Sequence, residues 1–154
     1  MNTTEVKRII EEEGLRPAKR RGQNFLVDAG VLEKILGAVD LSRDDRILEI
    51  GPGLGALTGP MIERAGHVTA VEIDSGFHRY LVKRFGHAPN LSLIHDDVLK
   101  IEPREQYTKI VSNLPYYCSS EILFWMARRE APLAYVMVQK ELAGRITAGA
   151  GEKD

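Results

Sequence analysis

The sequence predicts an α/β fold with a central parallel β-sheet and helices on both of its faces. Short apolar segments of strand length alternate with helical segments along most of the chain, and this alternation is typical of β-α-β units. Right-handed crossovers then place helices on both sides of the sheet. The glycine-rich and polar segments follow the carboxyl ends of the apolar strands, which is where open parallel sheets bind ligands. These two observations predict one ligand site along one edge of the sheet.

The composition is that of a single globular domain. The chain has 154 residues, of which 44% are hydrophobic and 28% are charged, with a net charge of −1. No apolar run reaches membrane-spanning length, and the N-terminal segment lacks the apolar core of a signal peptide. Cys118 is the single cysteine, which excludes an internal disulfide and fits a reducing compartment. We therefore expect a cytoplasmic protein with no membrane segment, and a monomer because nothing resembles a dimer seam.

Residues 1–27 are expected to form an N-terminal helix and a basic arm that leads into the loop "QNFL". Thr3 or Thr4 can cap the helix, and Gly14 followed by Pro17 can end it. The segment "RPAKRR" allows two interpretations, a solvated connector or an arm that contacts phosphates. The basic residues of that arm are Arg16, Lys19, Arg20 and Arg21.

Residues 28–154 are expected to form the main domain. Asp28 can cap its first helix, in which apolar side chains recur three and four residues apart up to residue 39. Five strands are expected, at residues 46–50, 67–74, 91–97, 107–113 and 133–138. Further helices are expected between the glycine-rich turn and residue 66, over 75–87, and over 119–129 with Ser119 or Ser120 as the cap. Four scattered histidines predict no metal site.

The first three strands end in residues that suit a nucleoside. Glycines 51, 53 and 55 let the backbone turn tightly and approach a ligand, although such a turn is often only a turn. Glu72 ends the second strand about 20 residues later, where a carboxylate can accept both ribose hydroxyls. Asp74 is better placed to cap the next helix. Asp96 or Asp97 could bind the exocyclic amine of an adenine, and a simple turn cap is equally favoured for either residue.

The segment "NLPYY" at residues 113–117 ends the fourth strand. Leu114 precedes a proline and is therefore extended, so its carbonyl and the side-chain oxygen of Asn113 can form a pair of acceptors for a planar amino group. Tyr116 offers a face for base stacking, which is worth roughly 1–3 kcal/mol, whereas Tyr117 is expected to pack. Asn113, Leu114, Pro115 and Tyr116 thus predict a catalytic turn that acts by positioning and electrostatics on a flipped-out or single-stranded base.

Six segments in this order resemble the ribosomal RNA adenine N6,N6-dimethyltransferase family, most closely its KsgA-type small-subunit branch. They are "QNFL" (23–26), "EIGPGLGALT" (49–58), "VEID" (71–74), "DDVL" (96–99), "SNLPYY" (112–117) and "MVQKELAGRI" (137–146). The resemblance implies a Rossmann-like class I S-adenosylmethionine-dependent methyltransferase. It also implies an enzyme that uses S-adenosyl-L-methionine to dimethylate two adjacent adenines of a small-subunit rRNA hairpin loop, within rRNA or the pre-small ribosomal subunit. The implied cofactor-binding residues are Asn24, Leu26, Gly51, Gly53, Glu72, Asp97 and Asn113.

The resemblance further implies that this chain stops inside the family's catalytic domain. The last strands of the sheet and the C-terminal helical rRNA-binding domain are expected to be absent, which would leave the strand at 133–138 as an exposed edge. Three alternatives stay open: a large-subunit rRNA methylase of the macrolide-resistance type, a fragment that binds cofactor or a pre-ribosome without turnover, and a nicotinamide-dependent oxidoreductase. The last is disfavoured, because the glycine spacing is G-x-G-x-G rather than G-x-G-x-x-G.

Overall fold

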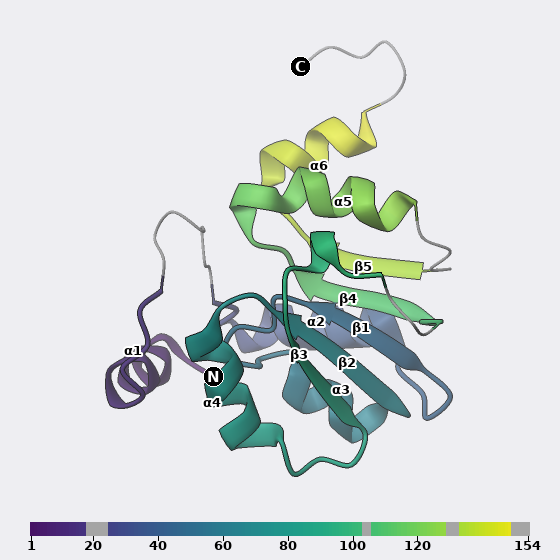
Figure 1. Cartoon of the computed structure of the whole chain (residues 1–154). Coiled ribbons are helices and arrows are strands. Elements are labelled where there is room, and N and C mark those ends of the chain that lie inside the picture. Colours follow the sequence, from purple (N-terminus) through teal and green to yellow (C-terminus); the bar gives the residue numbers. More distant parts are fainter. Residues whose placement is uncertain (18–24, 103–105, 129–132, 149–154) are drawn as a thin grey trace.

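The sheet has five parallel strands in the order β3-β2-β1-β4-β5 (Figure 1). The structure is a computed structural model, and it describes residues 1–17, 25–102, 106–128 and 133–148. The strands are β1 (Arg46–Ile50), β2 (His67–Glu72), β3 (Leu91–His95), β4 (Lys109–Asn113) and β5 (Leu133–Met137). The predicted parallel α/β fold is confirmed. The described sheet ends at β5, so that strand is an edge as expected.

Six α-helices and two short 3-10 helices accompany these strands in the described part of the chain. The α-helices are α1 (Thr3–Glu12), α2 (Ala29–Val39), α3 (Thr58–Arg64), α4 (Ser75–Phe85), α5 (Ser119–Ala127) and α6 (Lys140–Thr147). The 3-10 helices are η2 (Val98–Lys100) and η3 (Tyr116–Cys118). Helix α6 was not predicted, since the pattern of residues 140–147 indicated neither a helix nor a strand.

Helices cover both faces of the sheet, as the crossover rule requires. On one face, Ile47, Val68 and Val111 of three neighbouring strands form a core with α2 and α3. On the other face, Leu48 and Ile110 form a core with α5. Strand β1 is therefore buried on both sides, which explains its nearly continuous apolar sequence.

The strand order places the carboxyl ends of β1 and β4 side by side at the point where the connection direction reverses. From β1 the chain proceeds outward to β2 and β3, and then returns to place β4 on the other side of β1. In open parallel sheets, ligands bind in the crevice at this switch point. The residues that follow β1, β2, β3 and β4 therefore belong to one edge of the molecule.

Helix caps set several element boundaries. Asp28 and Asp74 cap α2 and α4 as predicted, each accepting two backbone N–H bonds with its carboxylate. Because Asp74 caps α4, β2 ends at Glu72 rather than at residue 74. Helix α1 is capped by Asn2, not by Thr3 or Thr4, because Asn2 forms a reciprocal pair with Glu5.

The predicted serine cap of α5 was also wrong. Cys118 occupies the cap position and makes no side-chain cap bond. The hydroxyl of Ser119 instead donates to the carbonyl of Pro115 at 2.8 Å. Ser119 therefore ties the helix back to the turn that precedes it.

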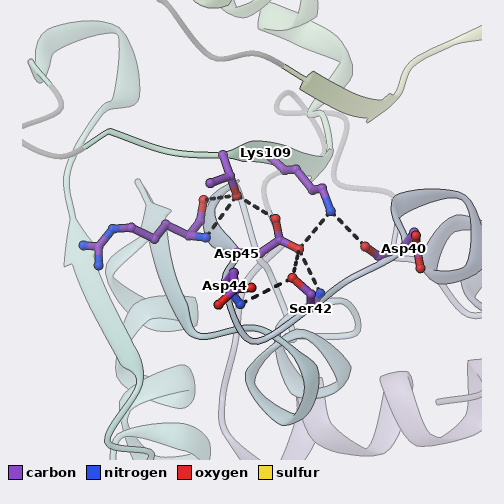
Figure 2. Close-up of polar contacts among 7 residues, drawn as sticks. Asp40, Ser42, Asp44, Asp45 and Lys109 are labelled. Carbon is purple, nitrogen blue, oxygen red and sulfur yellow. Dashed lines mark hydrogen bonds and ion pairs between the residues drawn. The ribbon is translucent and has the colours of Figure 1, made fainter.

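A buried ion pair joins Asp45, the residue before β1, to Lys109 of β4 at the opposite end of the sheet (Figure 2). The Nζ of Lys109 lies 2.8 Å from Oδ2 of Asp45 and 2.8 Å from the carbonyl oxygen of Asp40. Asp45 also accepts bonds from the Ser42 backbone and the Thr108 hydroxyl. Burial alone would raise the pKa of Asp45, but the bonds from Lys109, Ser42 and Thr108 outweigh it and lower the pKa from 3.8 to about 2. The network anchors the connection from α2 to β1 against β4.

Two exclusions follow from the described residues. No helix among them is long and apolar enough to cross a membrane. No three of their histidine, cysteine, aspartate and glutamate side chains gather where they could hold a metal ion.

We predict that Asp45→Asn destabilises the protein at pH 7 and that the effect disappears in acid. A pKa lowered from 3.8 to about 2 corresponds to about 2 kcal/mol of stability. Because the folded-state pKa lies below the unfolded one, this stability is present above pH 4 and is lost as the pH falls toward 2. Urea unfolding of the wild type and variant at pH 7 and at about pH 1.5, below the folded-state pKa, measures it.

The matched control is Glu13→Gln, which removes a carboxylate from the exposed ion pair with Lys83 at 2.7 Å. It should change stability little, since exposed pairs are screened by water. An equal loss in both variants, or a loss for Asp45→Asn that persists in acid, would contradict the assigned role of the buried pair.

Candidate functional site

The turn after β1 depends on three glycines. Gly51, Gly53 and Gly55 have φ angles of +67°, +57° and +76°, which lie in the left-handed region that favours glycine. The N–H of Gly51 donates to the carbonyl of Val71 at 2.9 Å, so the turn stays bound to β2. At Gly55 a Cβ would lie 2.5 Å from the ring of Phe85. Gly55 is therefore required by packing as well as by its backbone conformation.

Glu72 links the end of β2 to this turn. Its Oε2 accepts the N–H of Gly53 at 3.0 Å, and its Oε1 accepts the N–H of Asp74 at 2.8 Å. The residue is 3% exposed. Burial raises the pKa of the carboxyl, and the backbone bonds from Asp74 and Gly53 oppose that rise. The predicted juxtaposition of Glu72 with the glycine turn is confirmed.

One cavity brings most of the predicted site residues together. Its lining includes Leu26, Gly51, Gly53, Glu72, Asn113, Leu114 and Pro115. The sequence placed these residues in four separate segments, and the parallel sheet gathers them at one edge. Other lining residues are Met1, Phe25, Glu49, Pro52, Leu54, Ala56, Leu57, Ile73 and Tyr117.

A second cavity adjoins the first and shares Gly51, Ile73, Pro115 and Tyr117 with it. Its walls are largely apolar, and its lining includes Asp96 and Asp97. The Oδ1 of Asp97 accepts the N–H of Leu99 at 3.1 Å and so caps η2. Asp97 is thus a turn cap, as one of the two interpretations of the sequence predicted, and it also lines a cavity; its binding of an adenine amine stays a prediction.

The turn that contains Asn113 is fixed on three sides. The N–H of Leu114 donates to the carbonyl of Met137 at 3.0 Å. The hydroxyl of Ser112 donates to the carbonyl of Ile50, and the hydroxyl of Ser119 to that of Pro115. The turn is therefore held by β1, β5 and α5 together, which gives it a defined position beside the glycine turn.

The two tyrosines lie differently from what the sequence predicted. Tyr117 is 46% exposed and lines both cavities, so the expectation that it packs was wrong. Tyr116 is 37% exposed and lines neither of these two cavities. The 3-10 turn η3 begins at Tyr116 and changes the direction of successive side chains, an effect that no strand-like pattern anticipates.

Glu49 was missed by the sequence analysis. It is 2% exposed on β1, lines the first cavity, and accepts the hydroxyl of Thr58 at 2.6 Å. Burial, with a smaller contribution from the charge of Glu72, raises its pKa from 4.5 to about 8, against the opposing effect of the Thr58 bond. The available signal was an acidic residue inside the apolar run "RILEI".

The remaining predicted residues fall at or beyond the edge of what is described. Arg16 is exposed after α1. Asn24, Lys19, Arg20 and Arg21 lie outside the described residues.

The two cavities suit a nucleoside that carries a polar extension. The glycine turn presents no side chain at Gly51 or Gly53, and a Cβ at Gly53 would reach to 3.7 Å from the ring of Phe25. The buried carboxyl of Glu72 lies beside that turn, where it can meet hydroxyl groups. The adjoining apolar cavity can take a planar base, with Asp97 in its lining.

Comparison with known families agrees with this geometry. The profile of the family described as "Ribosomal RNA adenine dimethylase" matches residues 15–154. The chain belongs to the ribosomal RNA adenine dimethylase family. The resemblance inferred from the six sequence segments is thereby confirmed.

The names of this chain's curated relatives refer to the small ribosomal subunit. It is 44% identical over 155 residues to "Ribosomal RNA small subunit methyltransferase A" of Dehalococcoides mccartyi (strain CBDB1), with 96% of this chain and 53% of that protein covered. It is 42% identical over 151 residues to "Probable ribosomal RNA small subunit methyltransferase A" of Methanothermobacter thermautotrophicus, with 98% and 55% covered. The chain therefore spans about half the length of the curated relatives that it matches.

Two solved structures share the fold of this chain: a dimethyladenosine transferase and a 23S rRNA methyltransferase. A dimethyladenosine transferase from Plasmodium falciparum matches with a TM-score of 0.74 and 32% identity, over 84% of this chain and 48% of that one. The 23S rRNA methyltransferase ErmE matches with a TM-score of 0.73 and 32% identity, over 80% and 51%. The Rossmann-like class I methyltransferase fold predicted for this dimethylase-family chain is confirmed.

We predict that Gly55→Ala destabilises the protein by about 2–4 kcal/mol. A side chain there must adopt a left-handed conformation, at roughly 1–2 kcal/mol, and must also displace the ring of Phe85. The control is Gly37→Ala in the last turn of α2, where a Cβ meets nothing within 4 Å. That change should stabilise by about 0.5–1 kcal/mol. Urea unfolding measures both, and a neutral Gly55→Ala would contradict the packing argument.

Proposed function

We propose that this chain carries the cofactor-binding and catalytic part of an S-adenosyl-L-methionine-dependent rRNA adenine N6,N6-dimethyltransferase. It transfers methyl groups to the N6 amines of two adjacent adenines in a small-subunit rRNA hairpin loop, during ribosome biogenesis. The observation that carries the proposal is the single cavity that Glu72, the glycine turn and the Asn113–Leu114–Pro115 turn line together. A donor site and an acceptor site thus share one space.

Donor binding falls to residues from three strand ends and the loop before α2. Glu72 accepts hydrogen bonds from the ribose hydroxyls, and Asp97 accepts one from the adenine amine. Gly51 and Gly53 leave room for the amino-acid part of the cofactor. Leu26 closes the site together with Asn24, which lies outside the described residues. S-adenosyl-L-methionine supplies a methyl group on a positively charged sulfur. The protein supplies polar groups that are held in fixed positions. Holding them in place contributes more to catalysis than adding further polar groups would.

Acceptor binding falls to the turn after β4. The lone pair of an adenine amine is delocalised into its ring, so the amine is a weak nucleophile. The side-chain oxygen of Asn113 and the carbonyl of Leu114 accept its two hydrogens and favour a pyramidal nitrogen, which returns electron density to the lone pair. A tyrosine face supports the flipped-out base, and Tyr117 joins Tyr116 as a candidate because it lines both cavities.

The small-subunit target is favoured over the large-subunit alternative by the names of the curated relatives. ErmE, a 23S rRNA methyltransferase, is 32% identical and keeps the large-subunit target as a second candidate. A third possibility is a cofactor- or pre-ribosome-binding fragment without turnover, since the chain spans about half of its curated relatives.

We further propose that two parts of the chain have separate roles. Residues 1–27 form the helix and basic arm, with Arg16, Lys19, Arg20 and Arg21 on phosphates, and residues 28–154 form the catalytic domain. The protein acts as a monomer in the cytoplasm on rRNA or a pre-small ribosomal subunit. The net charge of −1 supports a local rather than a global contact with RNA.

We predict that Asn113→Ala lowers methyl transfer at least about 100-fold, because it removes one of the two acceptors for the target amine. The measurement is transfer of labelled methyl groups from S-adenosyl-L-methionine to undermethylated small subunits, large subunits and naked rRNA. The control is Gln106→Ala, an exposed amide before β4. Label on large subunits would favour the second candidate, and cofactor binding without label would favour the fragment.

We predict that Arg20→Ala with Arg21→Ala flattens the salt dependence of RNA binding. If each arginine neutralises a phosphate, the slope of log affinity against log salt should fall by about one to two units. The control is Lys34→Ala with Arg64→Ala, two exposed residues of α2 and α3. An unchanged slope in the arm variant would make segment 16–21 a solvated connector.

A further inference from the structure

The carboxyl ends of β1 and β4 are neighbours, but the parallel ladder between them stops early. The paired register of these two strands ends at Leu48↔Ile110, two residues before β1 ends. On their outer sides, β1 pairs with β2 up to its last residue, Ile50, and β4 pairs with β5 up to its last residue, Asn113. Each of the two ends is thus paired with its outer neighbour, and the ladder does not join them to each other.

Ser112 joins the two strands beyond the end of their ladder. Its hydroxyl donates to the carbonyl of Ile50, and the two residues are buried, with 1% and 3% exposed. Ile50 directly precedes Gly51 of the glycine turn, and Ser112 directly precedes Asn113. Ser112 itself lines neither of the two cavities. Its hydroxyl therefore acts on the site through the backbone that it holds.

The two turns that follow this bond approach each other closely. A Cβ at Gly51 would lie 3.7 Å from Cδ of Pro115, and both residues line both cavities. The N–H of Gly51 donates to β2, and the N–H of Leu114 donates to β5. Each turn is thus anchored to an outer strand, and the hydroxyl of Ser112 links one anchored unit to the other.

The proposed reaction is sensitive to the separation of these two turns. The donor lies against the glycine turn, and the target amine lies against Asn113 and Leu114. Reacting atoms must approach to about 3–3.5 Å, and a misplacement of about 1 Å can cost roughly 100-fold in rate. At each transfer the bond between sulfur and the methyl carbon breaks, its electron pair stays on sulfur, and the nitrogen lone pair forms the new bond. The nitrogen then gives one proton to solvent.

A monomethylated target is held less firmly than an unmodified one. The unmodified adenine amine donates two hydrogens, one to the side chain of Asn113 and one to the carbonyl of Leu114. The monomethylated amine has one hydrogen left, so it loses one of these bonds and also brings a methyl group into the same space. Its position is then set more by the width of the site than by hydrogen bonds.

Resting on the proposed function, we propose that Ser112 is a positioning residue that sets the distance between the donor and the target amine, and that the second methylation depends on it more than the first. Without the hydroxyl, the acceptor turn is no longer tied to β1 at the level of the glycine turn. The enzyme then transfers methyl groups more slowly and releases more monomethyladenine.

The first test is methyl transfer by the whole chain to undermethylated small subunits, with monomethyladenine and dimethyladenine separated after digestion of the rRNA. Ser112→Ala should lower kcat about tenfold and change the KM for S-adenosyl-L-methionine less than about twofold. It should also raise the share of monomethyladenine. Ser112→Cys, whose thiol is a weaker donor than a hydroxyl, should fall between the wild type and Ser112→Ala.

The second test needs no turnover and follows amide hydrogen exchange in the ligand-free protein. Ser112→Ala should speed exchange in segments 51–55 and 114–119, because the two turns can then open independently. Calorimetric titration with S-adenosylhomocysteine should give an affinity within about twofold of the wild type, since the residues that line the donor cavity are unchanged. Melting temperatures show whether each variant folds.

The matched control is Thr108→Val, which removes a hydroxyl that joins the same two chain segments at the amino ends of the strands. That hydroxyl accepts the N–H of Arg46 at 3.1 Å, and Thr108 lines neither of the two cavities. The change should lower the melting temperature while kcat, the share of monomethyladenine and exchange in the two turns stay at their wild-type values. The control thereby separates a loss of stability from a change of position.

The outcomes separate this inference from the proposed function. The inference alone is overturned if Ser112→Ala keeps the wild-type share of monomethyladenine, if both turns keep their wild-type exchange, or if Thr108→Val shifts the product share equally. If Ser112→Ala does not fold, Ser112→Cys decides by the same comparisons. If the wild type transfers no methyl group, the proposed function fails and the inference fails with it.

Discussion

The pair of hydrogen bonds accepted by Glu72 is the contact on which the rest of the site depends. One oxygen holds the glycine turn through Gly53, and the other holds the residue that caps α4. A single buried carboxylate thus joins β1, β2 and α4 at the point where the cavity opens. Without it, two backbone N–H groups beside the cavity would lose their partner, and buried polar groups without partners are costly. The proposed function assigns ribose binding to the same group, so one side chain would serve both anchoring and recognition.

Much of the fold was predictable because local signals and tertiary constraints agree. The strands are apolar since both faces of the sheet are covered, and Asp28 and Asp74 precede helices at positions where a side chain must accept backbone N–H bonds. The cap of α1 was misplaced because Asn2 and two threonines compete within three residues, and only the partner Glu5 decides between them. Helix α6 was missed because its short sequence contains few apolar residues and none of them is buried.

The candidate site was predictable where it depends on strand ends and unpredictable where it depends on side-chain direction. Parallel strands bring their carboxyl ends together, so Glu72, Asn113 and the glycine turn could be placed in one cavity from sequence alone. Tyr117 could not, because the 3-10 turn that orients it has no periodic pattern. Glu49 could not either, since the burial and the nearby charge of Glu72 that raise its pKa arise only when the sheet and α3 pack together.

The ion pair of Asp45 and Lys109 lies at the amino ends of β1 and β4, with Asp45 just before β1, and the cavity lies at their carboxyl ends. Stability and the proposed ligand binding would therefore depend on separate positions along the same two strands. For protein engineering, a library confined to residues 40–46 and 106–109 would sample resistance to heat and acid while leaving every described cavity residue unchanged. A library confined to the cavity would explore cofactor analogues on a scaffold whose anchoring at the other end stays intact.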